Sequence, residues 1–529
     1  MQLAVDLLRN CRENHARCQG QGPLPKRVIF VGSPEDEHPR LHKSNGEEAH
    51  YAALSHCWGD KFAAVRTIKS TISTESLRTK SISLDSLPQT FRDAIVITRR
   101  LGLRYLWIDS LCILQDCEED WHCHSESMRD IYMGATVTIS ADKATNCFGG
   151  IFESSNNGRT GRVVINPRGS KNPIYVRPTQ LSIYKFQNAT GSQGQKFMHH
   201  APISDPLFRR AWSLQEWILS RRLLRFGSGG LTWECEHEVR CECHPGRSQP
   251  CFPPRLHEPQ QEKRISELSR YDNRNNLLGN WLALIEHYSG REVTVGGDRL
   301  PALAGLAAAA APFAQEIYLY GHWKGLRFHE SLLWKSHRTC ASLKPVHTRT
   351  VESRHAPTWS WPSITGQVTT SSNPCIRSDF RVLETHGYPA TLSPSDTLNS
   401  EAYILAAGST MELQIWKHED PRHDLFEGDR YKSDLSRRVF ASPLGRVQGQ
   451  TFELALTVDV DAPGLEVAQG NVLTFLLAAK RTGLVLRKRL LGGEAAGYRY
   501  ERVALFEILD EGNRLQWESR AIRKSLMIV

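Results

Sequence analysis

The chain has 529 residues, of which 40% are hydrophobic, 9% aromatic and 23% charged. These values are typical of a packed protein of two or three domains and exclude a mainly disordered or fibrous chain. Lysine and arginine outnumber aspartate and glutamate by 66 to 57, but no long basic block concentrates the net charge of +9, so nucleic-acid binding is not indicated.

No segment has the pattern of a membrane span or a secretion signal. The most apolar window, 300–314, contains two prolines and is shorter than the roughly 20 residues that a spanning helix needs. The amino terminus places Asp6 among its apolar residues, so it lacks an uninterrupted hydrophobic region. Thirteen irregularly spaced cysteines favour free thiols in a reducing compartment. We therefore expect a cytoplasmic protein.

The first 235 residues alternate apolar runs with amphipathic segments. The apolar runs predict strands at 26–32, 51–57, 105–113 and 136–141. Helical spacing of apolar residues predicts helices at 87–102, 118–132 and 207–221. The segment 33–48 is predicted as a polar loop, and the runs 223–226 and 231–235 as a hairpin. This alternation favours an α/β fold with a mainly parallel sheet that helices cover on both faces.

Changes in composition and periodicity suggest domain boundaries. A polar, proline-bearing run forms the best linker candidate, helical patterns follow it, and the last 160 or so residues change to the spacing of strands. The predicted divisions are a lead-in helix and strand at 1–50, a first domain at 51–235, a linker at 236–261, a helical region at 262–365 and a β-rich region at 366–529.

Polar side chains follow two of the predicted strands where a ligand would bind. Ser55, Trp58 and Gly59 end one strand, Asp109 interrupts another, and Gln115 follows it. Ligands of open parallel sheets bind outside the carboxyl ends of the strands. If the two strands are neighbours, these side chains line one crevice. The alternative is that Ser55 and Asp109 cap helices or bind turn amides.

A second candidate site lies on the predicted helix 207–221. Glu216 stands between Trp212 and Trp217, where a carboxylate beside indole rings can act as an acid, a base or a stabiliser of positive charge. The alternative is an ion pair with a neighbouring arginine. We therefore take Glu216 and Asp109 as catalytic candidates, and Ser55, Trp58, Gly59, Gln115 and Trp212 as candidates for ligand binding.

Two groups of cysteine and histidine raise the question of a metal. Cys11, His15 and Cys18 share one face of a helix by their spacing, and six Cys and His residues lie within 235–251. Neither group has the paired CxxC form of most structural zinc sites, so we interpret the residues as incidental thiols and predict no metal and no cofactor. Motifs of P-loop NTPases, serine hydrolases and dinucleotide-binding folds are missing from the sequence.

Four motifs, in this order and spacing, resemble the fungal heterokaryon incompatibility (HET) domain. They are YAALSHCWGD at 51–60, LPQTFRDAIVITRRLGLRYLWIDSLCILQD at 87–116, the pattern beginning with DW at 120–141, and RRAWSLQEWILSRRLLRF at 209–226. The matching positions include Leu54, Ser55, Trp58, Gly59, Trp107, Asp109, Cys112, Gln115, Trp212, Gln215 and Glu216. Leu114 departs from the family, which often has Asp or Asn there.

The resemblance implies an effector of programmed cell death that acts in allorecognition when unlike hyphae fuse. It also implies a flavodoxin-like fold related to Toll/interleukin-1 receptor (TIR) domains, some of which hydrolyse NAD with a glutamate. With this resemblance, two functions follow as hypotheses: an effector that acts by self-association, and an NAD(P)-cleaving glycohydrolase. A third hypothesis, a zinc-dependent or nucleic-acid-binding regulator, rests only on the groups of cysteine and histidine and on the net charge of +9. The trigger is expected to be a separate sensor protein or the C-terminal region of the chain.

Overall fold

The computed structural model forms two compact units, Met1–Glu267 and Leu268–Val529, and each is described by itself. The residues that the structure describes are 1–32, 38–59, 69–152, 163–165, 174–176, 205–228, 230–242, 274–325, 327–336, 356–370, 376–377, 379–386, 402–416, 437–443, 452–458, 472–490, 498–508 and 511–529. Most of the predicted linker, and the cysteines and histidine of 243–251, lie outside these residues. Among the described helices, none combines the length and the apolar character that crossing a bilayer demands.

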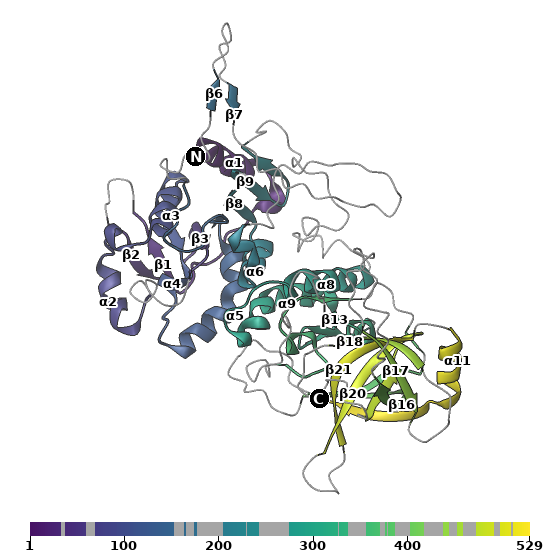
Figure 1. Ribbon diagram of the computed structural model, residues 1–529. Coiled ribbons are helices and arrows are strands. Elements are labelled where there is room, and N and C mark those ends of the chain that lie inside the picture. Colours follow the sequence, from purple (N-terminus) through teal and green to yellow (C-terminus); the bar gives the residue numbers. More distant parts are fainter. Residues whose placement is uncertain are drawn as a thin grey trace. The chain divides into compact units, whose positions relative to one another are not determined.

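The N-terminal unit is a sheet with helices packed on it (Figure 1). Its helices are α1 (Gln2–Asn14), α2 (Ile72–Lys80), α3 (Gln89–Arg100), α4 (Asp109–Cys112), α5 (Glu118–Gly134) and α6 (Trp212–Leu219), with short 3-10 helices at Ala16–Cys18, Leu84–Ser86 and Pro206–Arg209. Its strands are β1 (Arg27–Phe30), β2 (Arg40–Lys43), β3 (Tyr51–Ser55), β4 (Tyr105–Trp107), β5 (Val137–Ser140), β6 (Val163–Ile165), β7 (Ile174–Val176), β8 (Arg222–Gly227), β9 (Gly230–Cys235) and β10 (Val239–Cys241).

The main sheet of this unit has parallel strands at its centre and antiparallel strands at both edges. Its order is β10-β9-β8-β5-β3-β4-β1-β2, in which the pairs β4–β3, β3–β5 and β5–β8 are parallel. The outer strands β1, β2, β9 and β10 pair in antiparallel fashion, so the sheet is mixed. All residues of β3 and β5 are buried, as strands covered on both faces must be.

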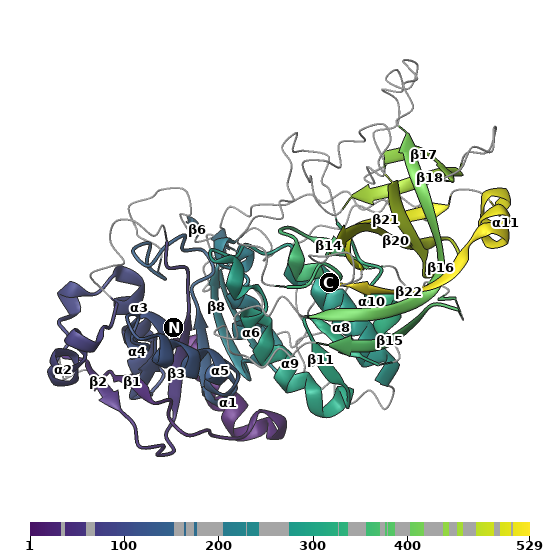
Figure 2. The same cartoon turned by 90° about the horizontal axis from the view of Figure 1, so that it is seen from below.

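The strand order reverses at β3 and β5. From β3 the chain passes through α2 and α3 to β4, and from β4 it returns through α5 to β5 on the other side of β3. Because crossovers between parallel strands are right-handed, opposite directions place α3 and α5 on opposite faces. The next crossover, through α6 to β8, continues in the direction of α5, and α5 and α6 are in contact (Figure 2).

The helix predicted at 87–102 is present as α3, and its ends follow from the sequence. Pro88 precedes its first residue, where a missing N–H has no cost. Phe91, Ala94 and Ile95 are buried on one face. Gly102 follows the helix with a φ of 74°, a conformation that glycine adopts without a steric penalty.

Two predicted elements were wrong in detail. The loop predicted at 33–48 contains β2, an edge strand that pairs with β1 and whose only buried residue is Leu41. The strand predicted at 105–113 stops at Trp107, because Asp109 begins the short helix α4 and its carboxylate accepts a hydrogen bond from the Ser110 N–H at 2.6 Å. Aspartate favours the first turn of a helix for this reason.

The C-terminal unit combines helices with a second large sheet. Its helices are α8 (Arg274–Ser289), α9 (Pro301–Ala314), α10 (Phe328–Ser331) and α11 (Glu511–Arg520), with short 3-10 helices at Gly296–Arg299 and Trp361–Ser363. Its strands are β11 (Ile317–Leu319), β12 (His322–Lys324), β13 (Lys335–Ser336), β14 (Val368–Thr369), β15 (Arg381–His386), β16 (Tyr403–Trp416), β17 (Arg437–Pro443), β18 (Phe452–Val458), β19 (Val472–Leu477), β20 (Thr482–Leu490), β21 (Tyr498–Ile508) and β22 (Ile522–Ile528).

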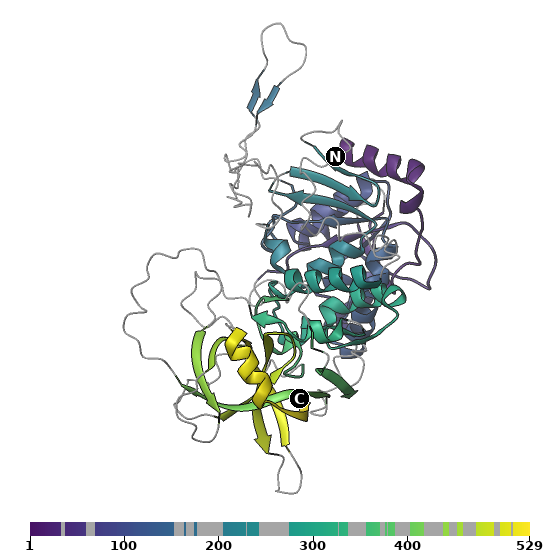
Figure 3. The same ribbon diagram turned by 90° about the vertical axis from the view of Figure 1, so that its right-hand side faces the viewer.

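The second sheet closes on itself. Its order is β15-β16-β17-β18-β21-β20-β19, and β16 also pairs with β19, which completes a ring (Figures 1 and 3). One hydrophobic core joins residues of the helical part, such as Leu333 and Trp359, to strand residues such as Leu505. Arg502 of β21 is fully buried and donates to the carbonyl oxygens of Leu332 and Trp334. The helical and β-rich parts of this unit therefore share a core.

Candidate functional site

The ends of β3, β4 and β5 meet at one edge of the N-terminal sheet. Ser55, the last residue of β3, pairs with Ser140, the last residue of β5. On the other side of β3, Ala53 lies opposite Trp107 of β4. The strands predicted to carry Ser55 and Asp109 are therefore neighbours. In open α/β sheets this edge, where the strand order reverses, is the usual place for a ligand.

Ser55 and Glu216 form a buried pair at this edge. The Ser55 hydroxyl donates to a carboxylate oxygen of Glu216, and the two residues are only 3% and 7% exposed. The buried helix α6 positions Glu216, and the Ser220 hydroxyl donates to the Glu216 carbonyl oxygen at 2.5 Å. A carboxylate that leaves water must gain polar partners, and Ser55 is one of them.

Trp58 and Asp109 form a second pair. The Trp58 indole N–H donates to Asp109 Oδ2 at 2.6 Å, while Oδ1 accepts from the Ser110 backbone N–H. The Lys69 ammonium lies 4.8 Å from the centre of the Trp58 ring, a distance at which a cation is attracted to the ring. Asp109 therefore binds a turn amide, as the alternative from the sequence had it, and also holds the loop that follows β3.

His56 follows Ser55 in the sequence, is buried, and lies close to Asp109 of the second pair. Its Nδ1 is 3.9 Å from Asp109 Oδ1, and its carbonyl oxygen accepts from Arg210 Nη1 at 2.9 Å. Burial lowers the pKa of His56 to about 4, although the nearby Asp109 carboxylate opposes this shift. The ring is therefore neutral at neutral pH.

The other three candidates lie around these pairs. The Gln115 amide donates to the carbonyl oxygens of Asp109 at 3.4 Å and Ile113 at 3.2 Å, so it braces the turn after α4. Gly59 has a φ of 91°, and a Cβ added there would be 2.5 Å from Asn146 Cβ. Trp212 is half-buried at the start of α6. The structure thus brings Ser55 to Glu216 and Trp58 to Asp109.

Sequence reasoning missed a buried charge network at the same edge. Arg225 of β8 donates to Asp142 at 2.8 Å and to Glu234 at 3.2 Å, and all three side chains are less than a tenth exposed. Burial raises the pKa of Asp142, against the effect of Arg225. Asp142 comes two residues after the end of the buried strand β5, so the rule that selected Asp109 would also have selected it. Nothing local in the sequence links it to Arg225.

A cavity and the side chain of Cys235 lie at the opposite edge of the sheet, where the parallel strands begin. A cavity of about 620 Å³ is lined by residues that include Leu8, Arg12, His50 and Arg222. His50 precedes β3 and Arg222 begins β8, so this cavity is at the amino ends of the parallel strands. Cys235 pairs with Arg222 and lies there too. The cavity is therefore separate from Ser55 and Glu216.

Comparison with known protein families gives a match within the N-terminal unit. Residues 51–216 match the family model described as Heterokaryon incompatibility protein (HET), so the chain carries a HET domain. This match runs from the start of β3 to Glu216 and includes all seven candidate site residues. Comparisons with curated proteins and with solved structures gave no match. The domain gives the chain a role related to heterokaryon incompatibility.

Proposed function

We propose that this chain is a cytoplasmic effector of programmed cell death in fungal allorecognition, and that its HET domain acts by self-association. The observation that carries the proposal is the HET match, which spans the core of the N-terminal sheet. The internal pairing of the motif residues supports a structural role for them, because Trp58, Asp109 and Gln115 bind one another or backbone groups. A rigid domain of this kind suits assembly triggered by a separate sensor or by the C-terminal unit.

The strand order supports a flavodoxin-like relationship for the domain. Read along the parallel strands, the order β4-β3-β5-β8 corresponds to the order 2-1-3-4 of doubly wound flavodoxin-like sheets. TIR domains have this kind of fold, and the resemblance noted from the sequence points the same way. Antiparallel strands at both edges extend the sheet beyond that pattern.

Expression of the full chain in a filamentous fungus tests the effector function. We expect growth to stop in cells in which the chain forms oligomers, as measured by light scattering on the extracted protein. Trp58→Phe removes the indole N–H that binds Asp109 and should reduce toxicity, while Trp121→Phe, in a residue outside both pairs, should not. Normal growth with abundant full-length protein would contradict the proposal.

A second function, cleavage of NAD(P) at its nicotinamide bond, is favoured by the pair Ser55 and Glu216. A carboxylate at the ligand edge of such a sheet can stabilise the positive charge that develops on the ribose, and a hydroxyl can hold a sugar oxygen. Trp58 or Trp212 would stack against a ring of the nucleotide. Glu216 is 7% exposed, so this function requires the pair to open toward the substrate.

The assay is nicotinamide release by purified full chain, with a melting curve for each variant. Glu216→Gln keeps the shape of the side chain and an acceptor for Ser55 but removes the charge, so release should fall by orders of magnitude. Glu234→Gln is the matched control, because Glu234 is a buried carboxylate of the same unit, bonded to Arg225 and Trp217. Absence of release from NAD or NADP by wild-type oligomers would rule out the enzymatic function for these substrates.

A further inference from the structure

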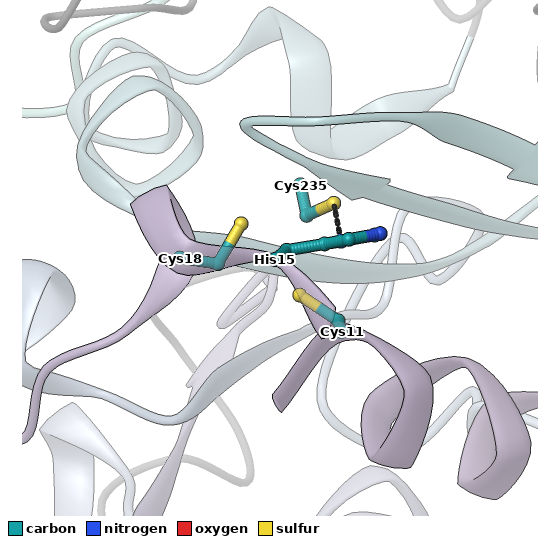
Figure 4. A group of neighbouring side chains, drawn as sticks. All are labelled: Cys11, His15, Cys18 and Cys235. Carbon is teal, nitrogen blue, oxygen red and sulfur yellow. Dashed lines mark hydrogen bonds between the residues drawn. The ribbon is translucent and has the colours of Figure 1, made fainter. Parts of the chain in front are cut away.

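Four side chains of the kinds that bind soft metals converge at the carboxyl end of α1. Cys11, His15, Cys18 and Cys235 place one sulfur or nitrogen atom each within 4.8 Å of all the others, and all four residues are buried (Figure 4). Three of them come from one short segment. The fourth comes from the end of β9, more than two hundred residues later in the sequence.

Local structure explains how the first three come together. Cys11 lies in the last turn of α1, His15 follows the end of this helix, and Cys18 ends the 3-10 turn Ala16–Cys18. α1 contacts β9 (Figure 3), so the strand brings Cys235 against the same turn. His15 Nδ1 lies 3.5 Å from the Cys235 sulfur, which directs this ring nitrogen into the cluster.

The donor set fits zinc. Three cysteine sulfurs and one histidine nitrogen form one of the usual tetrahedral sets of structural zinc, with Zn–S distances of about 2.3 Å. Sulfurs arranged in this way around one ion are about 3.8 Å apart. The ligand atoms of the cluster lie within 4.8 Å of one another, so small side-chain movements would bring them to the distances of a zinc site. All four positions of a tetrahedron are taken by protein atoms, which is typical of a structural site and not of a catalytic one.

Groups around the cluster support a bound cation with thiolate ligands. Glu238 Oε1 is buried and lies 4.0 Å from His15 Nε2, the ring nitrogen that faces away from the cluster. A carboxylate behind a ligating histidine commonly fixes its orientation. Arg222 Nε lies 3.1 Å from the Cys11 sulfur. Three thiolates around one Zn²⁺ carry a net charge of −1, and the buried Arg222 guanidinium offsets it.

We propose that Cys11, His15, Cys18 and Cys235 bind one structural Zn²⁺, which fastens the N-terminal helix α1 to strand β9. Such a site joins a segment that precedes the HET match to a strand that follows it. The interpretation of these residues as incidental thiols explains neither the histidine in the cluster nor the carboxylate behind it. A disulfide between two of the cysteines would leave the third thiol and His15 without a role.

Metal analysis of the full chain tests the site. Protein purified under reducing conditions without chelator should contain one zinc per chain, as measured by mass spectrometry of the metal. Cys18→Ser and Cys235→Ser should each lower the zinc content at least tenfold. Cys147→Ser, in a buried free thiol outside the cluster, should leave it at one. Cys235→His, which keeps a ligand for zinc, should retain more metal than Cys235→Ser.

Because a ligand variant can also fail to fold, wild-type protein provides the second measurement. Removal of the metal with a chelator and addition of Co²⁺ should produce the absorption bands of tetrahedral thiolate-bound cobalt, and Zn²⁺ should displace them. Wild-type protein with less than a tenth of an equivalent of zinc and no cobalt bands overturns the proposal. A zinc content equal in Cys18→Ser and Cys147→Ser, or a disulfide within the cluster in mass spectra, also overturns it.

Discussion

Arg27 of β1 holds both carboxylate oxygens of Asp120, in the first turn of α5, through two hydrogen bonds of 2.9 Å. Both residues are only 4% exposed, and Asp120 also accepts from Lys26 at 2.8 Å and from the Leu114 N–H at 2.9 Å. The two hydrogen bonds tie strand β1, which lies between β4 and β2, to helix α5. Bidentate pairs of this kind are the strongest of the charged hydrogen bonds.

Asp120→Asn should destabilise the N-terminal unit by up to about 3–5 kcal/mol, since it removes the buried carboxylate that Arg27 holds through two hydrogen bonds and leaves Arg27 paired with Glu75. Urea unfolding of the full chain measures the loss. Asp130→Asn, which breaks the surface pair with Arg129, should cost less than about 1 kcal/mol. Equal losses of stability in Asp120→Asn and Asp130→Asn would contradict the role of the buried pair.

Burial acts to raise the pKa of Asp120, but hydrogen bonds from Arg27 and Lys26 outweigh it and lower the pKa. The stabilisation that ionised Asp120 provides should therefore be complete above about pH 4 and disappear as the pH falls further.

Ser55→Ala should destabilise the unit by about 1–3 kcal/mol, because the buried Glu216 carboxylate loses a hydrogen bond. Glu216→Gln retains an acceptor for the Ser55 hydroxyl and should cost less. A double-mutant cycle with both changes should give a coupling energy that is clearly different from zero. Ser76→Ala, in an exposed residue of α2, should change stability by less than about 0.5 kcal/mol. Additive effects at residues 55 and 216 would show that the pair is not coupled.

The neutral, buried His56 should make the protein sensitive to mild acid. Its pKa of about 4 in the folded chain is lower than the ordinary value of about 6.5. The contribution of neutral His56 to stability is therefore complete above about pH 6.5 and is lost as the pH falls toward 4. This loss is on the order of 3 kcal/mol in total. Other buried histidines contribute as well, so the test is a comparison of wild type with His56→Asn between pH 7 and pH 4. Parallel curves for the two proteins would refute the role of His56.

Gly59→Ala should destabilise the loop after β3 for two reasons. The positive φ costs energy for any residue with a Cβ, and the added atom meets Asn146. Gly46→Ala is the control, because Gly46 also has a positive φ but nothing lies within 4 Å of an added Cβ. We expect Gly59→Ala to lower the melting temperature more than Gly46→Ala does, because it should lose about 1–3 kcal/mol more of the free energy of unfolding. If the two variants melt together, the approach to Asn146 is not tight.

Limited proteolysis should separate the chain near 244–261, between the predicted domain and the helical region. This run is polar and rich in proline, and the two compact units divide nearby, after Glu267. N-terminal sequencing of the first stable fragments identifies the cut. A first stable fragment that ended near residue 150 would show that α6 does not belong with the N-terminal sheet.

The sequence predicts best those elements whose pattern reflects their own burial. β3 and β5 are buried on both faces, so their apolar runs were recognisable, and α3 has a clear apolar face with glycine after its end. β2 was missed because an edge strand with one buried residue has no such pattern. The strand around Asp109 was drawn too long because hydrophobic content alone does not distinguish a strand end from a buried turn of helix.

The candidate site was predictable in its residues but not in its contacts. Polar residues at strand ends indicated Ser55 and Asp109, yet the partner of Ser55 lies 161 residues away. The same limit explains why the spacing of Cys11, His15 and Cys18 raised the question of a metal but did not lead to a predicted site, since the fourth side chain, Cys235, comes from β9. Contacts of this kind are set by the strand order and not by any local pattern.

Strand β16 pairs along its length with β15, β17, β19 and β22, and its residue Ile404 lies opposite Ile528. During synthesis on the ribosome, more than a hundred residues must be added after β16 before its last partner, β22, is complete. The main sheet of the N-terminal unit, in contrast, has all its strands by Cys241. Premature termination before the end of β21 would release a chain with a complete main sheet in the N-terminal unit and an open C-terminal ring. The unpaired strand edges and exposed apolar surface of the open ring would make such a chain prone to aggregation.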